Sequence, residues 1–350
     1  KENNLKRNKL KGKSLSRSIG RRLNKYVVVT RHGAGIKPGR DTYFVGVGIA
    51  LVVILLVVWL ISCLAGCGNG NHRGDNSTAT CTDSDRDGDD VTSGDEGETS
   101  TEALPRKDIQ DYRDYDSLSH KKYSWYIKRD PDHGQSGCDD QIPIEKYEGY
   151  YVDRDVDETE KIMYFTFDCG YENGYTEQIL DILKKHNAKA CFFVTQTYIR
   201  DNAEIVKRMK EEGHQVGNHT VTHPSMPEIS VEKQIKELRD CEEYMKEATG
   251  YDMDLYFRPP SGEYSEQLLQ LASDLGYRTI FWSIAYLDYD VNKQPGASYV
   301  IDHFKKYHHN GAFVLMHNVS SSNAEALDTV LTDLETRGYR FPSLDEMFTK

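Results

Sequence analysis

Residues 163–174 read Met-Tyr-Phe-Thr-Phe-Asp-Cys-Gly-Tyr-Glu-Asn-Gly. The stretch opens with β-forming residues at 164–167, presents a carboxylate at Asp168 and breaks at Gly170. This pattern predicts a short buried strand that delivers an acid to the end of a sheet, where the backbone turns sharply. We therefore expect the chain downstream of the strand to build a site that Asp168 faces.

Downstream of this strand, short apolar runs alternate with helical patterns. After the first run at 162–167, strand-like runs are found at 190–194, 215–217, 256–257, 279–284, 312–316 and 339–341, and helical patterns at 177–186, 203–212, 231–248, 265–275, 297–307 and 324–336. Such alternation predicts βαβ units and a parallel sheet. No glycine-rich dinucleotide loop follows the first strand. We expect an α/β fold, a distorted and incomplete (β/α) TIM-like barrel of about seven parallel strands, although periodicity alone does not separate it from a Rossmann sheet.

Ionisable side chains follow five of these predicted strands. They are Asp168 after the first, His219 and His223 after the third, Arg258 after the fourth, Asp288 after the fifth and His317 after the sixth. In a parallel barrel the C-terminal ends of the strands carry the active site. One such histidine would most often be structural, but five placements at one end of a barrel indicate a catalytic site.

Two histidines four residues apart predict a metal site. His219 and His223 can ligate one ion if the intervening chain turns tightly. Imidazole nitrogen suits Zn²⁺ and related divalent ions. Such an ion polarises a carbonyl and lowers the pKa of a bound water.

The remaining polar residues fit the other roles in amide or ester hydrolysis. Asp168 is a candidate general base, and Arg258 is a candidate partner that keeps it ionised. His317 is a candidate proton donor to the leaving group, and Asp288 would orient it. Backbone N–H groups near Ser261 and Gly262 would offer an oxyanion site.

Taken together, these residues resemble the five ordered motifs of the polysaccharide deacetylase family, the NodB homology domain of carbohydrate esterase family four. The matching segments are 166–170, 219–223, 258–262, 282–288 and 315–317. The resemblance covers residues 161–350. It implies a distorted (β/α) barrel that uses a divalent metal, usually zinc or cobalt, to remove acetyl groups from N-acetylated sugars.

The resemblance also implies residue roles. Asp168 would be the base, His317 the acid, His219 and His223 the metal ligands, and Arg258 and Asp288 the supporting partners. Substrate contacts would come from Tyr171, Asn173, Ser261 and Trp282, with Ser261 standing where the family has a tyrosine.

Within the family, the sequence Asp-Cys-Gly-Tyr-Glu-Asn-Gly at 168–174 is similar to the Asp-Asn-Gly-Tyr-Glu-Asn-Gly of delta-lactam-forming N-acetylmuramic acid deacetylases of spore cortex peptidoglycan. This implies peptidoglycan as the substrate, with N-acetylmuramic acid as the sugar that loses its acetyl group. One alternative is an N-acetylglucosamine deacetylase acting on peptidoglycan or another glycan. The other is a catalytically weak, glycan-binding pseudoenzyme.

Cys169 departs from the wider family, which mostly has a second aspartate there as the third metal ligand. Three interpretations remain open. The thiolate is a ligand, which would suit zinc. Alternatively, the residue is a filler beside a metal held by two histidines and water, or it is an inert buried thiol beside a weakened site.

The first third of the chain does not have a globular composition. Residues 1–40 hold thirteen Lys and Arg against one acid, Glu2, and predict a basic cytoplasmic tail over 1–43. An uncharged apolar run predicts a transmembrane signal anchor at 44–66. The basic flank places the rest of the chain outside the membrane.

Two segments follow this predicted anchor. Residues 67–115 form an acidic, low-complexity linker that we expect to be disordered. Residues 116–160, where aromatic residues return, are expected to be an N-terminal extension of the catalytic domain at 161–350, either packed on it or a mobile arm.

A lipoprotein is the alternative to the signal anchor, because Leu-Ala-Gly-Cys at 64–67 resembles a lipobox with Cys67 as the lipidated residue. The long basic region and the long apolar run favour the anchor. The net charge of −12 argues against nucleic acid as the main partner.

Overall fold

The computed structural model describes residues 104–349, apart from 140 and 158. The predicted basic tail at 1–43, the anchor at 44–66, and residues 67–103 of the predicted linker, with Cys67, lie outside these residues. The end of that linker, 104–115, is described, and the prediction of disorder is wrong there: Tyr115 is buried and its hydroxyl donates to Asp274 at 2.9 Å. Within the described part, none of the helices is both long enough and apolar enough to cross a membrane.

The core of the described part is a curled parallel sheet, and the longest of its described strands is β5 (Lys161–Cys169), the predicted first strand. Seven of the described strands follow one another across it in the order β11-β5-β6-β7-β8-β10-β4, and each neighbouring pair is parallel. The other six are β11 (Ala312–His317), β6 (Ala190–Val194), β7 (Gln215–Asn218), β8 (Tyr256–Phe257), β10 (Arg278–Ile280) and β4 (Gly149–Tyr150).

Two isolated bridges join the ends of this sheet. Ile284 pairs with Val314 in parallel, and Val152 pairs with Ala312 in antiparallel fashion. The strand path therefore curls back toward β11, which confirms the expected distorted barrel.

Both faces of β5 are buried. Met163, Phe165 and Phe167 pack in the cluster that faces the helices, whereas Ile162 and Tyr164 belong to the cluster inside the barrel. Strands that are buried on both faces form continuous apolar runs and do not alternate with polar residues. This explains why the stretch at 162–167 is apolar almost throughout.

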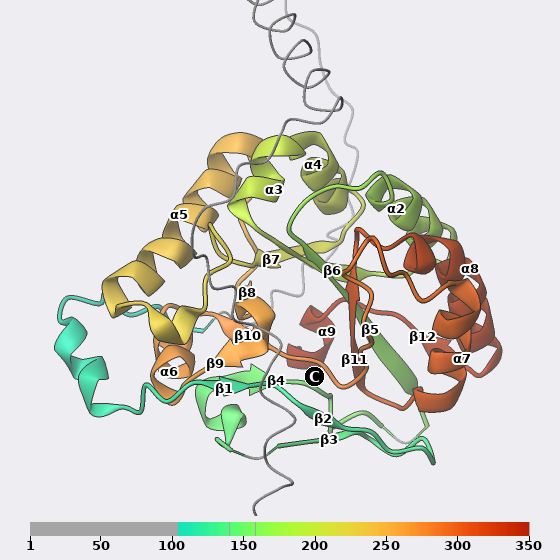
Figure 1. Cartoon of the computed structure of the whole chain (residues 1–350), viewed down its shortest axis with the longest axis horizontal. Helices are drawn as coiled ribbons and strands as arrows, with labels where there is room; N and C mark the ends of the chain where they lie inside the picture. Colours follow the sequence, from blue (N-terminus) through green and yellow to red (C-terminus); the bar gives the residue numbers. More distant parts are fainter. Residues whose placement is uncertain (1–103, 140, 158, 350) are drawn as a thin grey trace, which may run out of the picture. The chain divides into compact units, whose positions relative to one another are not determined.

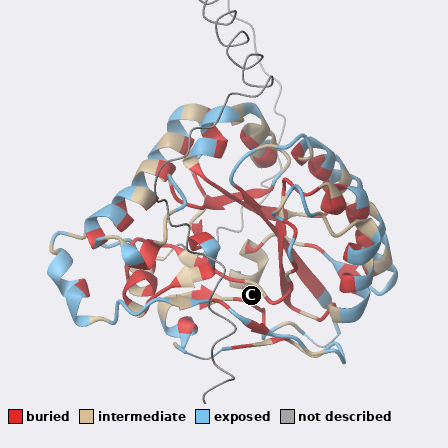
Figure 2. Cartoon of the chain, in the orientation of Figure 1, coloured by how far each residue is buried: buried red, intermediate tan, exposed pale blue. Residues whose placement is uncertain are grey.

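The helices form an arc around the strands (Figure 1). Their buried sides face the sheet and their exposed sides face solvent, as Figure 2 shows. They are α2 (Thr176–Lys185), α3 (Gln196–Asp201), α4 (Ala203–Glu211), α5 (Val231–Thr249), α6 (Glu266–Asp274), α7 (Ala297–Tyr307) and α8 (Ser321–Thr336). The short α9 (Asp345–Phe348) is not part of this arc and has no buried residue. Short 3₁₀ turns lie at Tyr112–Ser117, Ile144–Tyr147, Met226–Glu228 and Pro260–Gly262.

The structure corrects three details of the predicted strands. The run at 279–284 forms a strand only to Ile280, because the chain then leaves β8 and crosses to β11 through Ile284. The run at 339–341 forms β12 (Tyr339–Arg340), which pairs with the start of β5 and lies off the main path. The seventh strand of that path is β4, which comes from the predicted extension.

Residues of the extension pack on the barrel through three further short strands. β1 (Tyr123–Ser124) pairs with β9 (Glu263–Tyr264), and β2 (Ile127–Lys128) pairs with β3 (Gly137–Cys138). Between β1 and β2, the Trp125 ring stacks on Phe281 with centroids 4.3 Å apart. Its Nε1 donates to the carbonyl oxygen of Trp282 at 2.9 Å. The extension therefore lies against the segment that follows β10.

Candidate active site

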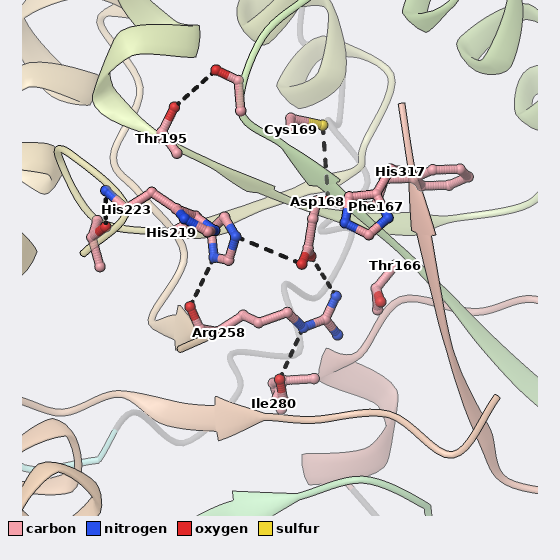
Figure 3. Close-up of polar contacts among 12 residues, drawn as sticks. Thr166, Phe167, Asp168, Cys169, Thr195, His219, His223, Arg258, Ile280 and His317 are labelled. Carbon is pink, nitrogen blue, oxygen red and sulfur yellow. Dashed lines mark hydrogen bonds and ion pairs between the residues drawn. The ribbon is translucent and has the colours of Figure 1, made fainter. Parts of the chain in front are cut away.

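Asp168 lies at the C-terminal end of β5 and pairs with a fully buried arginine (Figure 3). Nη1 of Arg258 donates to Oδ1 of Asp168 at 2.7 Å. Burial alone would raise the pKa of Asp168, but the charge and hydrogen bond of Arg258, together with the charge of His317, outweigh it and hold the pKa below its ordinary value. Asp168 is therefore ionised near neutral pH, and its Oδ2 is turned toward His219.

The barrel backbone holds Arg258 in place. Its Nε donates to the carbonyl of Ile280 at 3.0 Å and its Nη2 to that of Phe281 at 3.3 Å. The guanidinium also lies over the ring of Phe193, 4.1 Å from the centroid. A buried arginine with these contacts is a rigid partner that keeps one oxygen of Asp168 in a fixed position.

His219 and His223 lie on the tight loop that follows β7, with ring centroids 4.8 Å apart. Nδ1 of His219 donates to the carbonyl of Arg258 at 2.8 Å, so Nε2 presents a lone pair. Burial lowers the pKa of His219 to about 4, which keeps the ring neutral. Its Nε2 lies 3.6 Å from Oδ2 of Asp168. Two electron-rich atoms thus face each other at the site.

Backbone strain gathers on the loops around this site. Of the six non-glycine residues with positive φ in the described part, Thr220, His223 and Ser261 lie on these loops, with φ of 71°, 56° and 56°. Such conformations cost roughly 1–3 kcal/mol each and persist where the surroundings enforce them. For the histidine loop, Glu237 of α5 provides the restraint, because its Oε2 accepts the N–H of Val221 at 2.9 Å.

His317, at the end of β11, pairs with a second buried carboxylate. Its Nδ1 donates to Oδ1 of Asp288 at 2.7 Å, and its backbone N–H donates to Oδ2 at 2.8 Å. Asn323 of α8 also donates to Oδ2 of Asp288, at 2.7 Å. Burial lowers the pKa of His317, but the charge and hydrogen bond of Asp288 outweigh it, and the net effect is a raised pKa. His317 is therefore poised to hold a proton.

A pocket of about 760 Å³ opens over these groups. Asp168, His219, His223 and His317 all line it. Much of the remaining wall is apolar or aromatic: Trp125, Tyr126, Ile127, Tyr171, Trp282, Tyr286, Leu287, Tyr289, Leu315 and Val319. A concave apolar site with a few convergent polar groups is the usual form of a small-ligand site.

Cys169 lies outside this pocket. Its side chain is fully buried among the residues that face the helices, on the opposite side of β5 from Asp168. Its sulfur contacts the carbonyl of Phe167 at 3.8 Å. Burial raises the pKa of the thiol well above its ordinary value, so the thiolate form is disfavoured. The structure does not bring Cys169 to the histidines, so of the three interpretations the thiolate ligand is wrong for this arrangement.

The predicted substrate-binding residues divide into two groups. Tyr171, Ser261 and Trp282 line the pocket. Asn173 does not line it, and its Nδ2 donates to the carbonyl of Val319 at 2.9 Å. The N–H of Gly262 donates to Pro259 at 3.0 Å and is already used within its turn, so this part of the expected oxyanion site is wrong.

Comparisons with known proteins agree with this geometry. The polysaccharide deacetylase family pattern matches residues 155–280. The peptidoglycan-N-acetylmuramic acid deacetylase PdaA of Bacillus subtilis is 42% identical over 238 residues, which cover 67% of this chain and 89% of PdaA. The chain belongs to the polysaccharide deacetylase family.

One further relative and a crystal structure are also similar to this polysaccharide deacetylase. A peptidoglycan-N-acetylglucosamine deacetylase of Bacillus cereus is 34% identical over 204 residues, which cover 56% of this chain and 92% of that protein. The crystal structure of Bacillus subtilis PdaA, a family 4 carbohydrate esterase, aligns with a TM-score of 0.63 at 41% identity, covering 66% of this chain and 98% of PdaA. The chain is thus a deacetylase of the hydrolase class that acts on amide bonds.

Enzymes of this family generally depend on a metal ion. In the described part of this deacetylase, no three His, Cys, Asp or Glu side chains form a group that could by itself hold an ion. The unprotonated Nε2 of His219 and the ionised Oδ2 of Asp168 nevertheless face each other across 3.6 Å. A cation nearby would relieve this juxtaposition. His219 and His223 both line the pocket, and two imidazoles are donors that suit zinc or a related divalent ion.

Two further residues shape the site of this deacetylase and were not predicted. Glu172 accepts hydrogen bonds from the N–H groups of Gly174 and Tyr175 at the start of α2, and from the hydroxyl of Tyr198 at 3.0 Å. Asn318, next to His317, donates to Glu172 at 3.3 Å and to the carbonyl of Tyr171 at 3.0 Å. These bonds tie the end of β5 to the end of β11. The only signals in the sequence were that Glu172 lies within 163–174 and that Asn318 follows His317.

Proposed function

We propose that this polysaccharide deacetylase removes the acetyl group from N-acetylmuramic acid residues of peptidoglycan in a zinc-dependent reaction, with cobalt or another divalent ion as a substitute. Support for the sugar comes from the PdaA relative at 42% identity. We further propose that the product closes to a muramic delta-lactam, as in spore cortex formed during sporulation, because a free amine beside the lactyl carboxyl group permits ring closure.

One observation carries the proposed chemistry. Asp168 and His317 are register partners on the adjacent parallel strands β5 and β11. Each has its own buried ion-pair partner, Arg258 for the acid and Asp288 for the histidine. These partners displace the two pKa values in opposite directions, so that one group accepts a proton while the other holds one. Such a division suits general base and general acid in one pocket.

The proposed steps use these two groups in turn. Oδ2 of Asp168 takes a proton from the attacking water while Arg258 holds Oδ1. The water oxygen bonds to the acetyl carbon, and Nε2 of His317 gives its proton to the amide nitrogen as the carbon–nitrogen bond breaks. Acetate and a free amine leave. A divalent ion held by His219 and His223 would supply carbonyl polarisation and a more acidic water.

The outer part of the pocket supports a glycan as the substrate. Tyr126, Tyr171, Leu287 and Tyr289 are between 51% and 76% exposed, and all four line the pocket. Exposed apolar groups gathered at a concave site mark a binding surface. Aromatic faces with a polar tip suit sugar rings, which have apolar faces and hydroxyl edges.

For the location we propose a membrane-bound enzyme with its catalytic domain outside the cell. The apolar run at 44–66 and the basic residues before it support a single signal anchor. Fractionation of cells that make the full chain should place the protein with membranes. Lipid labelling of the full chain and of Cys67→Ser distinguishes the signal anchor from the lipoprotein. A lipoprotein would be labelled and would lose the label in Cys67→Ser, whereas the substitution would not change the labelling of a signal anchor.

Acetate release tests the function. The full chain with zinc should release acetate from peptidoglycan, lose this activity on chelation and regain it with added zinc. Asp168→Asn should lower the rate at least about 10³-fold, because the base is removed. Mass analysis of the products identifies the sugar: a muramic lactam supports the proposal, and deacetylated glucosamine supports the alternative enzyme. Full activity in Asp168→Asn would refute the mechanism.

A further inference from the structure

Arg129 extends from the end of β2 into the wall of the pocket. Its Nη2 donates to the carbonyl of Ala285 at 2.8 Å. Its guanidinium also lies over the ring of Tyr307, 5.7 Å from the centroid. Both Arg129 and Ala285 line the pocket, and Ala285 lies three residues before Asp288. The arginine is therefore exposed but held in one direction.

Within residues 104–349, as far as the structure describes them, no carboxylate forms an ion pair with Arg129. Among the residues that the structure describes, Arg129 is the single Lys or Arg that lines the pocket, and it takes part in none of their ion pairs. The adjacent Asp130 is turned into its own loop, where its Oδ1 accepts the N–H of Asp132 at 2.8 Å. An oriented, exposed guanidinium that lines the pocket is therefore available to an anion from outside the chain.

We infer that Arg129 binds a carboxylate of the glycan substrate and so selects muramic acid-containing glycans over neutral ones. The inference rests on the proposed function, because it names the group of that substrate which this pocket recognises. Two sources of the carboxylate share this chemistry: the lactyl group of a muramic residue without a peptide, and a stem peptide attached to the lactyl group. A polymer of N-acetylglucosamine alone has neither.

The geometry suits this ligand class. A guanidinium offers several N–H donors in one plane, and one bond to Ala285 leaves others for a paired contact with a carboxylate. Because Arg129 is exposed, we expect a gain in binding of about tenfold and a clear dependence on salt. Arg129 touches no group that moves a proton, so the effect should fall mainly on KM.

Arg129→Gln is the test variant, and Lys128→Gln is its matched control. Lys128 is the last residue of β2 and directly precedes Arg129. Its Nζ lies 3.2 Å from Oδ1 of Asp139, and it does not line the pocket. The two variants each remove one positive charge, and the two positions are adjacent in the chain. The full chain is assayed on glycan with free lactyl groups, on the same glycan with stem peptides, and on chito-oligosaccharide.

We expect Arg129→Gln to lower kcat/KM for at least one of the two carboxylate-bearing glycans about tenfold more than for chito-oligosaccharide. The loss should appear as a higher KM. Arg129→Lys should recover part of the loss, and Lys128→Gln should not discriminate between the substrates. A loss on the free lactyl glycan identifies the lactyl group as the source, and a loss only with stem peptides identifies the peptide. An equal loss on all three substrates, or none, overturns the inference.

A binding measurement tests the role of Arg129 independently of the proposed deacetylase activity. Calorimetry of the full chain with the lactyl glycan and with the peptide-bearing glycan compares the affinities of the natural protein and Arg129→Gln, whether or not acetate is released. Absence of acetate release from every glycan would count against the proposed function. Equal binding of both glycans by the two proteins would count against the role of Arg129.

Discussion

The imidazole of His317 and the carboxylate of Asp288 are joined at 2.7 Å between Nδ1 and Oδ1, and Oδ2 of the same carboxylate accepts the backbone N–H of His317. One acid thus fixes both the ring and the strand end that carries it. The Asp288 side chain is 1% exposed, so little water screens the pair. This relationship makes the protonation of His317 depend on a residue that does not line the pocket.

Asp288→Asn should move the alkaline limit of activity to lower pH. The pKa of His317 is raised because Asp288 outweighs burial, so removal of the charge leaves burial to favour the neutral ring. The acid form is present below this pKa, and a smaller fraction of it would remain at neutral pH. We expect a rate loss of about 10²-fold at neutral pH, measured as acetate release against pH. Asp302→Asn, on the exposed side of α7, is the control. An unmoved alkaline limit would contradict the role given to Asp288.

Cys169→Ser should leave the bound zinc and the rate close to those of the natural protein. The thiol lies among the helix-facing core residues, so its loss removes no group from the pocket. A buried hydroxyl in its place should lower the free energy of unfolding by about 1–2 kcal/mol. Cys241→Ser, at another fully buried thiol in the same core, should behave alike. Metal analysis of both variants tests this prediction. If Cys169 were a thiolate ligand, Cys169→Ser would lose zinc and Cys241→Ser would retain it.

Tyr171→Ala and Asn173→Ala should differ although both residues belong to the same loop. Tyr171 is 51% exposed on the pocket wall, and loss of its ring should raise KM about fivefold. Asn173 instead binds the carbonyl of Val319, so its loss should lower the free energy of unfolding by about 1 kcal/mol with little change in KM. Steady-state kinetics and urea unfolding of both variants measure this. The reverse pattern would place Asn173, and not Tyr171, against the substrate.

His214→Asn should make the fold less sensitive to acid. Burial lowers the pKa of His214 to about 4, whereas the unfolded chain binds this proton near pH 6.5. As the pH falls through that window the unfolded state takes up the proton first, so stability is lost between about 6.5 and about 4. Nδ1 of His214 accepts the N–H of Ala190 at 3.3 Å, a bond that the asparagine oxygen can replace.

Urea unfolding at about pH 7 and about pH 5 measures this contribution. The natural protein should lose about 2 kcal/mol more than His214→Asn over this interval, because one buried histidine no longer titrates. His120→Asn, at an exposed histidine, should lose as much as the natural protein. Equal losses in all three proteins would show that His214 does not contribute.

The sequence predicted the barrel and the end of it that carries the site, because apolar runs alternate with helical patterns and polar residues follow the runs. It did not predict β4 as the seventh strand of the path, since Gly149–Tyr150 is too short to leave a pattern. Nor did it identify Arg129 or Glu172. Their roles depend on Ala285 and on Asn318, which lie 156 and 146 residues away along the chain.

Residues 163–174 show what the sequence determined by itself and what depended on the tertiary structure. By itself the sequence determined that β5 is a buried strand and that Asp168 stands at its end, because a run of β-forming residues stops at an acid and a glycine. Only the tertiary structure decided whether Asp168 or Cys169 faces the pocket. Both faces of β5 are apolar, so the sequence does not distinguish the barrel interior from the helix-facing side. Packing against Phe193 and Tyr256 on one face, and against α2 and α8 on the other, turns Asp168 inward and Cys169 away.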